Sequence, residues 1–211
     1  MHARWYFDFI SPFAYLQWPR IRALSAQVTF DYRPILFAAV LDQHGQKGPA
    51  EIAGKRTFTY RFVQWRADRL GIPLRFPPAH PFNPLAALRL CIAAGSTPAA
   101  ITAIFDHIWR DGARADDAAA LAEVARGLGV HDVEAAIAAP EVKAALKRNT
   151  EAALADGVFG VPSIVTRDEV FWGEDATEMF EAFLADPALF EGAEMQRLRD
   201  LPEGVRRKVA R

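Results

Sequence analysis

The order of strand and helix signals along the 211-residue chain predicts an α/β fold: a β-α-β unit, a long helical block and a closing β-β-α unit. Three observations support this prediction. An apolar strand-like run passes into a helix near the N-terminus, an alanine-rich helical pattern fills residues 36–155, and strand signals return after residue 160. A chain of this length buries roughly 70% of its unfolded surface, so its core needs no disulfide or metal to hold it.

The N-terminal unit consists of a strand over residues 4–9, a helix over 12–24 and a second strand over 28–34, where apolar and polar residues alternate. Ser11 is a preferred N-cap residue, and Pro12 suits the first helical position because its missing N–H would have no partner there. A hydroxyl at the positive end of a helix dipole stabilises an anion such as a phosphate or a thiolate. Ser11 is therefore a candidate anion site, and a simple helix cap is the alternative.

The helical block is divided by clusters of glycine, proline and aspartate. These breaks fall at residues 45–49, 71–84, 95–98, 111–117 and 127–132. Strands follow at 163–166 and 170–172, joined by a tight hairpin at 167–169, and a closing helix covers 175–185.

This order is that of a thioredoxin-like core interrupted by a large all-helical insertion. We predict a discontinuous core domain, an insertion domain and a charged, solvated C-terminal tail. Their respective bounds are 1–35 with 156–186, 36–155, and 187–211.

The composition argues against several classes of function. A net charge of −1 gives no reason to expect a nucleic acid as partner. The sequence contains no run of 18 apolar residues, the length that would indicate a membrane span. The N-terminus shows no basic region, long apolar stretch or cleavage site of a secretory signal, so we expect a cytoplasmic protein.

Cys91 is the one cysteine, and it lies in an apolar helical run, so we expect a buried and inert thiol. A single cysteine rules out an internal disulfide and a Cys-x-x-Cys redox pair. The five histidines show no close ligand spacing and give no support for a metal site. They are His2, His44, His80, His107 and His131.

Two further segments carry candidate binding groups. The Val161–Pro162 bond precedes a strand and is a candidate cis peptide. In a thioredoxin-like core it faces the first helix N-terminus, where the Val161 backbone could pair with an extended peptide ligand; a tight turn without a ligand is the alternative. Asp175 opens the closing helix, either as its N-cap or as a carboxylate that pairs with the ammonium of a small peptide ligand.

Five collinear segments give the chain a recognisable pattern. It resembles the 2-hydroxychromene-2-carboxylate isomerase family, relatives of the kappa-class glutathione transferases in the DsbA-like thioredoxin superfamily. The resemblance covers residues 4 to about 185. The matching segments are 8–15 (DFISPFAY), 71–73 (GIP), 81–85 (PFNPL), 157–162 (GVFGVP) and 171–175 (FWGED).

The resemblance implies a glutathione-dependent cis–trans isomerase acting on an aromatic 2-oxo acid, with glutathione as cofactor and a homodimer as assembly. Ser11 would hold the glutathione sulfur and favour its thiolate, which adds to an unsaturated carbon of the substrate and later leaves. Val161 and Pro162 would pair with the cysteinyl backbone. The implied glutathione contacts continue with Asn83, Trp172, Gly173, Glu174 and Asp175.

Several residues are candidates for holding the substrate. The resemblance makes Lys47, Lys55 and Arg56 candidates for a glycine or substrate carboxylate, although each is also an ordinary solvated charge. The rings of Phe13, Phe37 and Trp65 are candidate cavity walls, with core packing as the alternative.

The chain also departs from the family pattern. Phe62 replaces a common aspartate, Ala176 a common arginine, and Trp65-Arg66-Ala67 a usual Arg-Trp-Ala. These changes weaken the prediction of one glutathione or partner-subunit contact.

Two alternatives to an isomerase remain open. A kappa-like glutathione transferase or peroxidase would use the same thiolate. A thioredoxin-like binding module without chemistry would fit the missing Cys-x-x-Cys, but the placement of Ser11 and Asp175 argues against it. The sequence pattern also shows no broad exposed apolar stripe of the kind that such a module would use.

Overall fold

A four-stranded mixed sheet organises the first part of the chain in the computed structural model, which describes residues 1–167 and 169–205. The strand order is β2-β1-β3-β4, with β1 parallel to β2 and antiparallel to β3, and β3 antiparallel to β4. The strands are β1 (His2–Phe7), β2 (Thr29–Pro34), β3 (Ser163–Val165) and β4 (Val170–Trp172). Asp168, in the predicted hairpin, and residues 206–211, in the predicted tail, lie outside the described residues.

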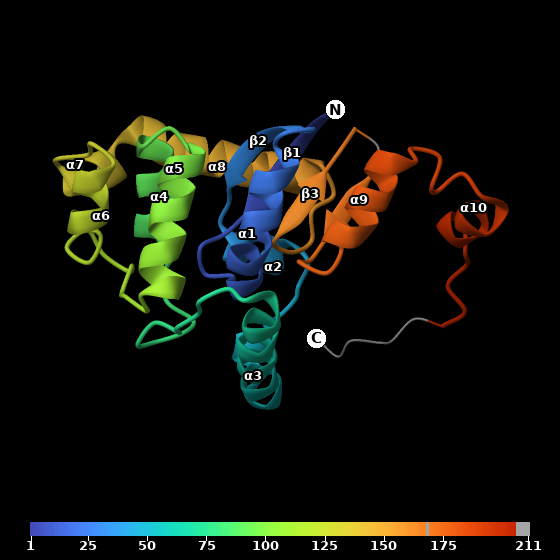
Figure 1. Cartoon of the computed structure of the whole chain (residues 1–211), viewed down its shortest axis with the longest axis horizontal. Helices are drawn as coiled ribbons and strands as arrows, with labels where there is room; N and C mark the ends of the chain where they lie inside the picture. The colour runs from blue at the N-terminus through green and yellow to red at the C-terminus, as the bar shows by residue number, and fades with distance from the viewer. Residues whose placement is uncertain (168, 206–211) are drawn as a thin grey trace. The chain divides into compact units, whose positions relative to one another are not determined.

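Helices connect β2 to β3 over almost 130 residues of chain, as the sequence predicts. Figure 1 shows the mid-chain helices α4 to α7 grouped beside the sheet, with α3 extending from it on its own. The helices up to β3 are α1 (Pro12–Leu24), α2 (Phe37–Gln43), η1 (Pro49–Glu51), α3 (Ala53–Leu70), α4 (Leu85–Ala93), α5 (Pro98–Phe105), the π-helical turn η2 (Asp106–Arg110), α6 (Ala122–Gly127), α7 (Val133–Ala138) and α8 (Pro140–Ala155).

The two faces of β1 bury different clusters, because successive side chains of a strand point in opposite directions. Trp5 and Phe7 stack on each other at 4.3 Å between ring centroids, and Trp5 also stacks on Trp18 of α1 at 5.1 Å. Tyr6 points the other way, and its hydroxyl donates to Asp156 at the end of α8. The core around Tyr6 comprises Ile35, Val40, Ala153, Val158, Val161 and Val165.

The chain divides into two compact units, Met1–Thr177 and Glu178–Arg211. α9 (Thr177–Ala185) begins at the last residue of the first unit, and the second contains α10 (Ala193–Arg199). Within the second unit, Phe183 stacks on Phe190 at 5.7 Å between centroids. No helix among residues 1–167 and 169–205 is both long enough and apolar enough to cross a membrane.

The predicted element order is confirmed, and the five predicted breaks fall at junctions between helices, three of them overlapping a helix end by one residue. Three details differ. β1 begins and ends two residues earlier than predicted, because Asp8 and Phe9 leave the ladder to form the turn before Ser11. α9 starts at Thr177, so Asp175 does not hold the predicted N-cap position. The predicted tail contains α10, where Arg197 and Glu194 form an i,i+3 ion pair.

Candidate functional site

The N-terminus of α1 is built as its sequence predicts. Ser11 has extended backbone angles, and its Oγ accepts a hydrogen bond from the Ala14 N–H at 3.3 Å. Pro12 occupies the first turn, and no acidic residue in that turn offsets the positive end of the helix dipole. Ser11 is 7% exposed, and in the part of the chain that the structure describes its hydroxyl hydrogen has no acceptor. This hydrogen is available to an anionic ligand.

The two peptide groups that precede Ser11 are fully hydrogen bonded. In the Phe9–Ile10 peptide, the carbonyl accepts from Trp109 Nε1 at 2.9 Å and the N–H donates to Asp8 Oδ1 at 3.1 Å. In the Ile10–Ser11 peptide, the carbonyl lies 2.8 Å from His80 Nε2 and the N–H donates to the Asp8 carbonyl at 3.0 Å. The turn that delivers Ser11 is therefore held on all four polar atoms.

Asp8 is a fully buried carboxyl group. Besides Ile10, it accepts a hydrogen bond from the Phe37 N–H, at 2.9 Å from Oδ2, and so joins the Ser11 turn to the start of α2. Burial raises the pKa of Asp8 from its ordinary 3.8 to about 7, against the opposing effect of its backbone N–H donors. Because no cation among the described residues offsets the burial, this carboxyl group keeps its proton to a higher pH than an ordinary aspartate does.

The predicted Val161–Pro162 cis bond is confirmed. No hydrogen bond within residues 1–167 and 169–205 uses the Val161 backbone N–H or C=O, so both remain free to pair with a ligand. The neighbouring Gly160 packs against the Trp172 indole so closely that an added Cβ would overlap its Nε1. Trp172 is 53% exposed and makes an edge contact with Phe159 at 5.2 Å between centroids.

Gln17 fastens the loop after β4 to α1. Its amide nitrogen donates to the Gly173 carbonyl at 3.0 Å and to Thr177 Oγ1 at 2.9 Å, while its oxygen accepts from Trp5 Nε1 at 2.6 Å. Gly173 has φ +99°, a conformation that favours glycine. The α1 N-terminus and residues 172–175 are thereby tied to one helix.

Glu174 and Asp175 have different surroundings. Glu174 is 3% exposed, and both of its carboxylate oxygens accept hydrogen bonds from Arg66 of α3, from Nε at 2.9 Å and from Nη2 at 3.2 Å. Asp175 is exposed, and its side chain makes no hydrogen bond in the described part of the chain. Of the two carboxylates, Asp175 is the one available to a ligand.

The remaining predicted residues lie at the edges of this site. Phe37 packs against the Tyr6 cluster that includes Val161, and half-buried Phe13 approaches Phe62 at 6.2 Å between ring centroids. Asn83 is exposed and its Oδ1 accepts from the Leu85 N–H, which leaves its amide hydrogens free to donate. Lys47 and Lys55 are exposed, with no ion pair among the described residues.

A narrow row of exposed aromatic rings, which the sequence pattern does not predict, lies on α3. α3 exposes Phe58 (69%), Phe62 (38%) and Trp65 (50%), and the three rings contact one another in sequence at 5.9 and 5.7 Å. Their spacing of four and three residues places them on one helical face. The low apolar content of the rest of α3 concealed this face, because the stripe is narrow and runs along a helix that is polar elsewhere.

Comparison with known proteins identifies the family. The DSBA-like thioredoxin domain matches residues 4–185. A 2-hydroxychromene-2-carboxylate isomerase from Pseudomonas putida is 32% identical over 186 residues, which cover 84% of this chain and 91% of that protein. The chain belongs to the 2-hydroxychromene-2-carboxylate isomerase family of DSBA-like thioredoxin domains. The resemblance drawn from the five sequence segments is confirmed.

Other relatives agree with this family assignment. A family member from Sphingobium xenophagum is 29% identical over 190 residues, 86% of this chain and 96% of that protein. A solved structure of a 2-hydroxychromene-2-carboxylate isomerase superposes with a TM-score of 0.77 at 26% identity, covering 96% of this chain and all of that one. Glutathione S-transferase kappa 2 from Caenorhabditis elegans is 26% identical over 206 residues, 87% of this chain and 92% of that protein.

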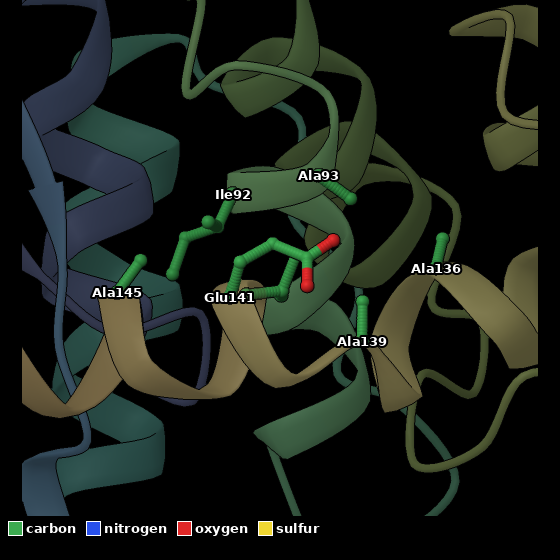
Figure 2. A pocket seen from close by; sticks show the side chains of 7 residues that line it. Ile92, Ala93, Ala136, Ala139, Glu141 and Ala145 are labelled. Carbon is green, nitrogen blue, oxygen red and sulfur yellow. The ribbon is translucent and has the colours of Figure 1, made fainter.

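A surface cavity lies away from these family motifs. Its volume is about 450 Å³, and Figure 2 shows Glu141 and Ile92 among its labelled lining residues. The lining comes from α4, α7, the residue between α7 and α8, and α8 itself, and includes none of the predicted site residues. Its walls are mainly alanine methyl groups, which offer few directed contacts to a ligand.

Cys91 is buried as predicted, and burial raises the pKa of its thiol to about 12. No group of three His, Cys, Asp or Glu side chains in the described ranges is arranged to hold a metal ion. Sequence reasoning missed three residues that hold the Ser11 turn by hydrogen bonds: Asp8, His80 and Trp109. Asp8 stands inside a quoted family motif, but His80 and Trp109 are far away in sequence and carry no local signal.

Proposed function

We propose that this protein is a glutathione-dependent cis–trans isomerase that interconverts 2-hydroxychromene-2-carboxylate and trans-o-hydroxybenzylidenepyruvate, or a similar aromatic 2-oxo acid. The observation that carries the proposal is the Ser11 hydroxyl at the N-terminus of α1, whose oxygen accepts from the Ala14 N–H and whose hydrogen has no acceptor among the described residues. The names of the relatives supply the substrate class.

The residues present fit glutathione as cofactor. Ser11 would donate its hydrogen to the sulfur, and the free Val161 N–H and C=O beside Pro162 would pair with an extended peptide backbone. The exposed Asp175 carboxylate would receive the γ-glutamyl ammonium, with Trp172 and Gly173 shaping the same loop. Asn83 would contribute its free amide hydrogens. Glu174 would contribute indirectly, because its ion pair with Arg66 holds this loop in place.

These residues would do the following in the reaction. Bound glutathione supplies a thiolate nucleophile. The Ser11 hydroxyl and the α1 dipole favour that charge and so lower the pKa of the thiol. Within residues 1–167 and 169–205, no histidine lies within hydrogen-bond distance of the Ser11 hydroxyl to act as its base, so we assign Ser11 to anion stabilisation rather than attack. Phe13 and Phe37 would face the aromatic ring of the substrate, and Lys47 or Lys55 its carboxylate.

Calorimetric titration with reduced glutathione tests this proposal directly. We expect saturable binding to the wild type, together with a bound thiol whose thiolate absorbance persists to a lower pH than that of free glutathione. Ser11→Ala should raise the pKa of the bound thiol and reduce isomerisation of the chromene carboxylate by roughly 100-fold, as for loss of one preorganised donor.

The matched control is Ser25→Ala, at the opposite end of the same helix, where the hydroxyl contacts the Ile21 carbonyl and the Tyr32 hydroxyl. This variant should bind glutathione as the wild type does. Absence of binding to the wild type at millimolar glutathione would refute the proposal.

A kappa-class transferase or peroxidase is the second candidate, favoured by the relative from Caenorhabditis elegans. Thiolate stabilisation is common to both reactions, so substrate preference separates them. A chromene carboxylate should react faster than a chlorodinitrobenzene-type electrophile if isomerisation is the main activity, and slower if transfer is.

We also propose a homodimer located in the cytoplasm. The exposed rings of Phe58, Phe62 and Trp65 favour an assembly that covers them, because isolated soluble chains rarely leave such a patch uncovered. A reduced thiol cofactor favours a reducing compartment. Sedimentation equilibrium would give twice the chain mass of 23.4 kDa for a dimer.

A further inference from the structure

His80 lies at the centre of an aromatic cluster that connects α3, the segment before α4 and the turn carrying Ser11. Its Nε2 is 2.8 Å from the Ile10 carbonyl oxygen, and its Nδ1 is 2.8 Å from the Tyr60 hydroxyl. The rings of Phe76, Phe82 and Trp109 surround it at 5.5 to 6.2 Å between centroids. The imidazole is thus held on both nitrogens and enclosed by apolar faces.

The hydrogen bonds determine which nitrogen of His80 carries the proton. A carbonyl oxygen has no hydrogen to give, so Nε2 must be the protonated nitrogen that donates to Ile10. Nδ1 then accepts from the Tyr60 hydroxyl, which also lies 2.7 Å from the His80 carbonyl oxygen and shares its one hydrogen between the two acceptors. Burial lowers the pKa of His80, which keeps the imidazole neutral near pH 7.

The charged groups around His80 are few. Tyr60 is the titratable side chain that contacts it, and Arg56, one turn earlier on α3, acts on the Tyr60 hydroxyl. Asp8 lies on the other side of the Ile10 peptide and bonds to the Ile10 N–H rather than to the ring. No described carboxylate contacts the imidazole, so its environment favours the neutral form.

We propose that His80 is a positioning residue for the proposed reaction, which, as its neutral Nε2–H tautomer, holds the Ile10 carbonyl and fixes the peptide that delivers the Ser11 hydroxyl. The inference rests on the proposed function, because Ser11 matters only if an anionic sulfur binds there. In the Ile10–Ser11 peptide, the N–H donates to a backbone carbonyl, whereas the carbonyl oxygen is held by a side chain, that of His80. Without it, the peptide can rotate and carry the serine away from the helix axis.

The test compares His80→Leu with His80→Gln. Leucine fills the space but cannot donate, whereas the Gln amide nitrogen can reach the position of Nε2 and donate the same hydrogen bond. We expect His80→Leu to raise the pKa of the bound glutathione thiol by about one unit and to lower kcat/KM about ten-fold, since a buried carbonyl loses its donor. His80→Gln should restore most of both. The control is His131→Leu at an exposed histidine.

A second readout needs no glutathione. The ¹⁵N chemical shifts of the His80 ring should show a protonated Nε2 and an unprotonated Nδ1 at pH 7.5, and Tyr60→Phe should shift the Nδ1 resonance. An Nδ1–H tautomer would overturn the inference. So would an unchanged thiol pKa in His80→Leu, once thermal unfolding shows that the variant is folded.

The two possible failures are distinguishable. A wild type that binds no glutathione overturns the proposed function and this inference with it. A wild type that binds glutathione as a thiolate, with the same thiol pKa in His80→Leu, overturns the inference alone.

Discussion

The buried carboxyl group of Asp8 makes the stability of this protein depend on pH in an unusual direction. Most carboxylates have a lower pKa in the folded state, so a protein gains stability as pH rises above 4. Asp8 contacts no cation among the described residues, and burial raises its pKa from 3.8 to about 7 despite its backbone donors. Replacing it with asparagine removes the titration while keeping nearly the same volume.

The magnitude follows from the size of the shift. Between pH 4 and pH 7 the unfolded state has lost the Asp8 proton and the folded state retains it, so the folded state binds more protons. Stability from this group is therefore complete below pH 4 and falls as pH rises through 7. A shift of three units corresponds to about 4 kcal/mol. The Asp8→Asn variant should not lose this stability as pH rises, because asparagine does not titrate.

Urea unfolding of both proteins at pH 4, 5, 6, 7 and 8 measures the effect. The difference in unfolding free energy, wild type minus Asp8→Asn, should decrease by about 4 kcal/mol across the series. Asparagine presents an NH₂ group to one of the two N–H donors, which adds a constant penalty and leaves the slope unchanged. The control is Asp42→Asn at an exposed carboxylate of α2. A flat difference would show that the Ile10 and Phe37 donors outweigh burial and would refute the reasoning.

Two further predictions concern the loop after β4. Glu174→Gln should lower the unfolding free energy by about 1–3 kcal/mol in urea titrations, since it removes the buried carboxylate charge that faces the Arg66 guanidinium. Asp116→Asn, at an exposed ion pair, should change the unfolding free energy by less than about 1 kcal/mol. Equal effects of the two substitutions would contradict this. Gly160→Ala should displace the Trp172 indole, which would shift the tryptophan emission and weaken glutathione binding in calorimetry. The unfolding free energy should change by less than about 1 kcal/mol, because the ring is half exposed and can move. Unaltered emission would count against the close packing.

Much of the fold could be predicted because its local signals agree with its tertiary contacts. The Ser11–Pro12 pair marks the start of α1 to the residue, since capping depends on neighbours along the chain. The return of strand signals near residue 163 places β3 correctly, because three consecutive apolar or small buried residues need no distant information.

The candidate site could be predicted only where its chemistry is local. Ser11 and Val161 stand in motifs, and the Ser11 hydroxyl hydrogen and the Val161 backbone groups have no partner among the described residues. His80 and Trp109 contribute through single hydrogen bonds to carbonyls 70 and 100 residues away, and periodicity contains no record of such pairings. The exposure of Phe58 was missed because nothing in the neighbouring sequence distinguishes an exposed ring from a buried one.

The helical block supplies the contacts that position Ser11, which bears on how the site can form. Phe37, His80 and Trp109 all lie within the predicted insertion of residues 36–155, and each bonds to the segment Asp8–Ile10 of the predicted core. Removing the block would leave two carbonyls and one carboxyl oxygen of that segment without their partners, each at a cost of about 1–3 kcal/mol. The cap of α1 can form locally, but the orientation of its serine cannot, so folding of the helical block and assembly of the site are coupled.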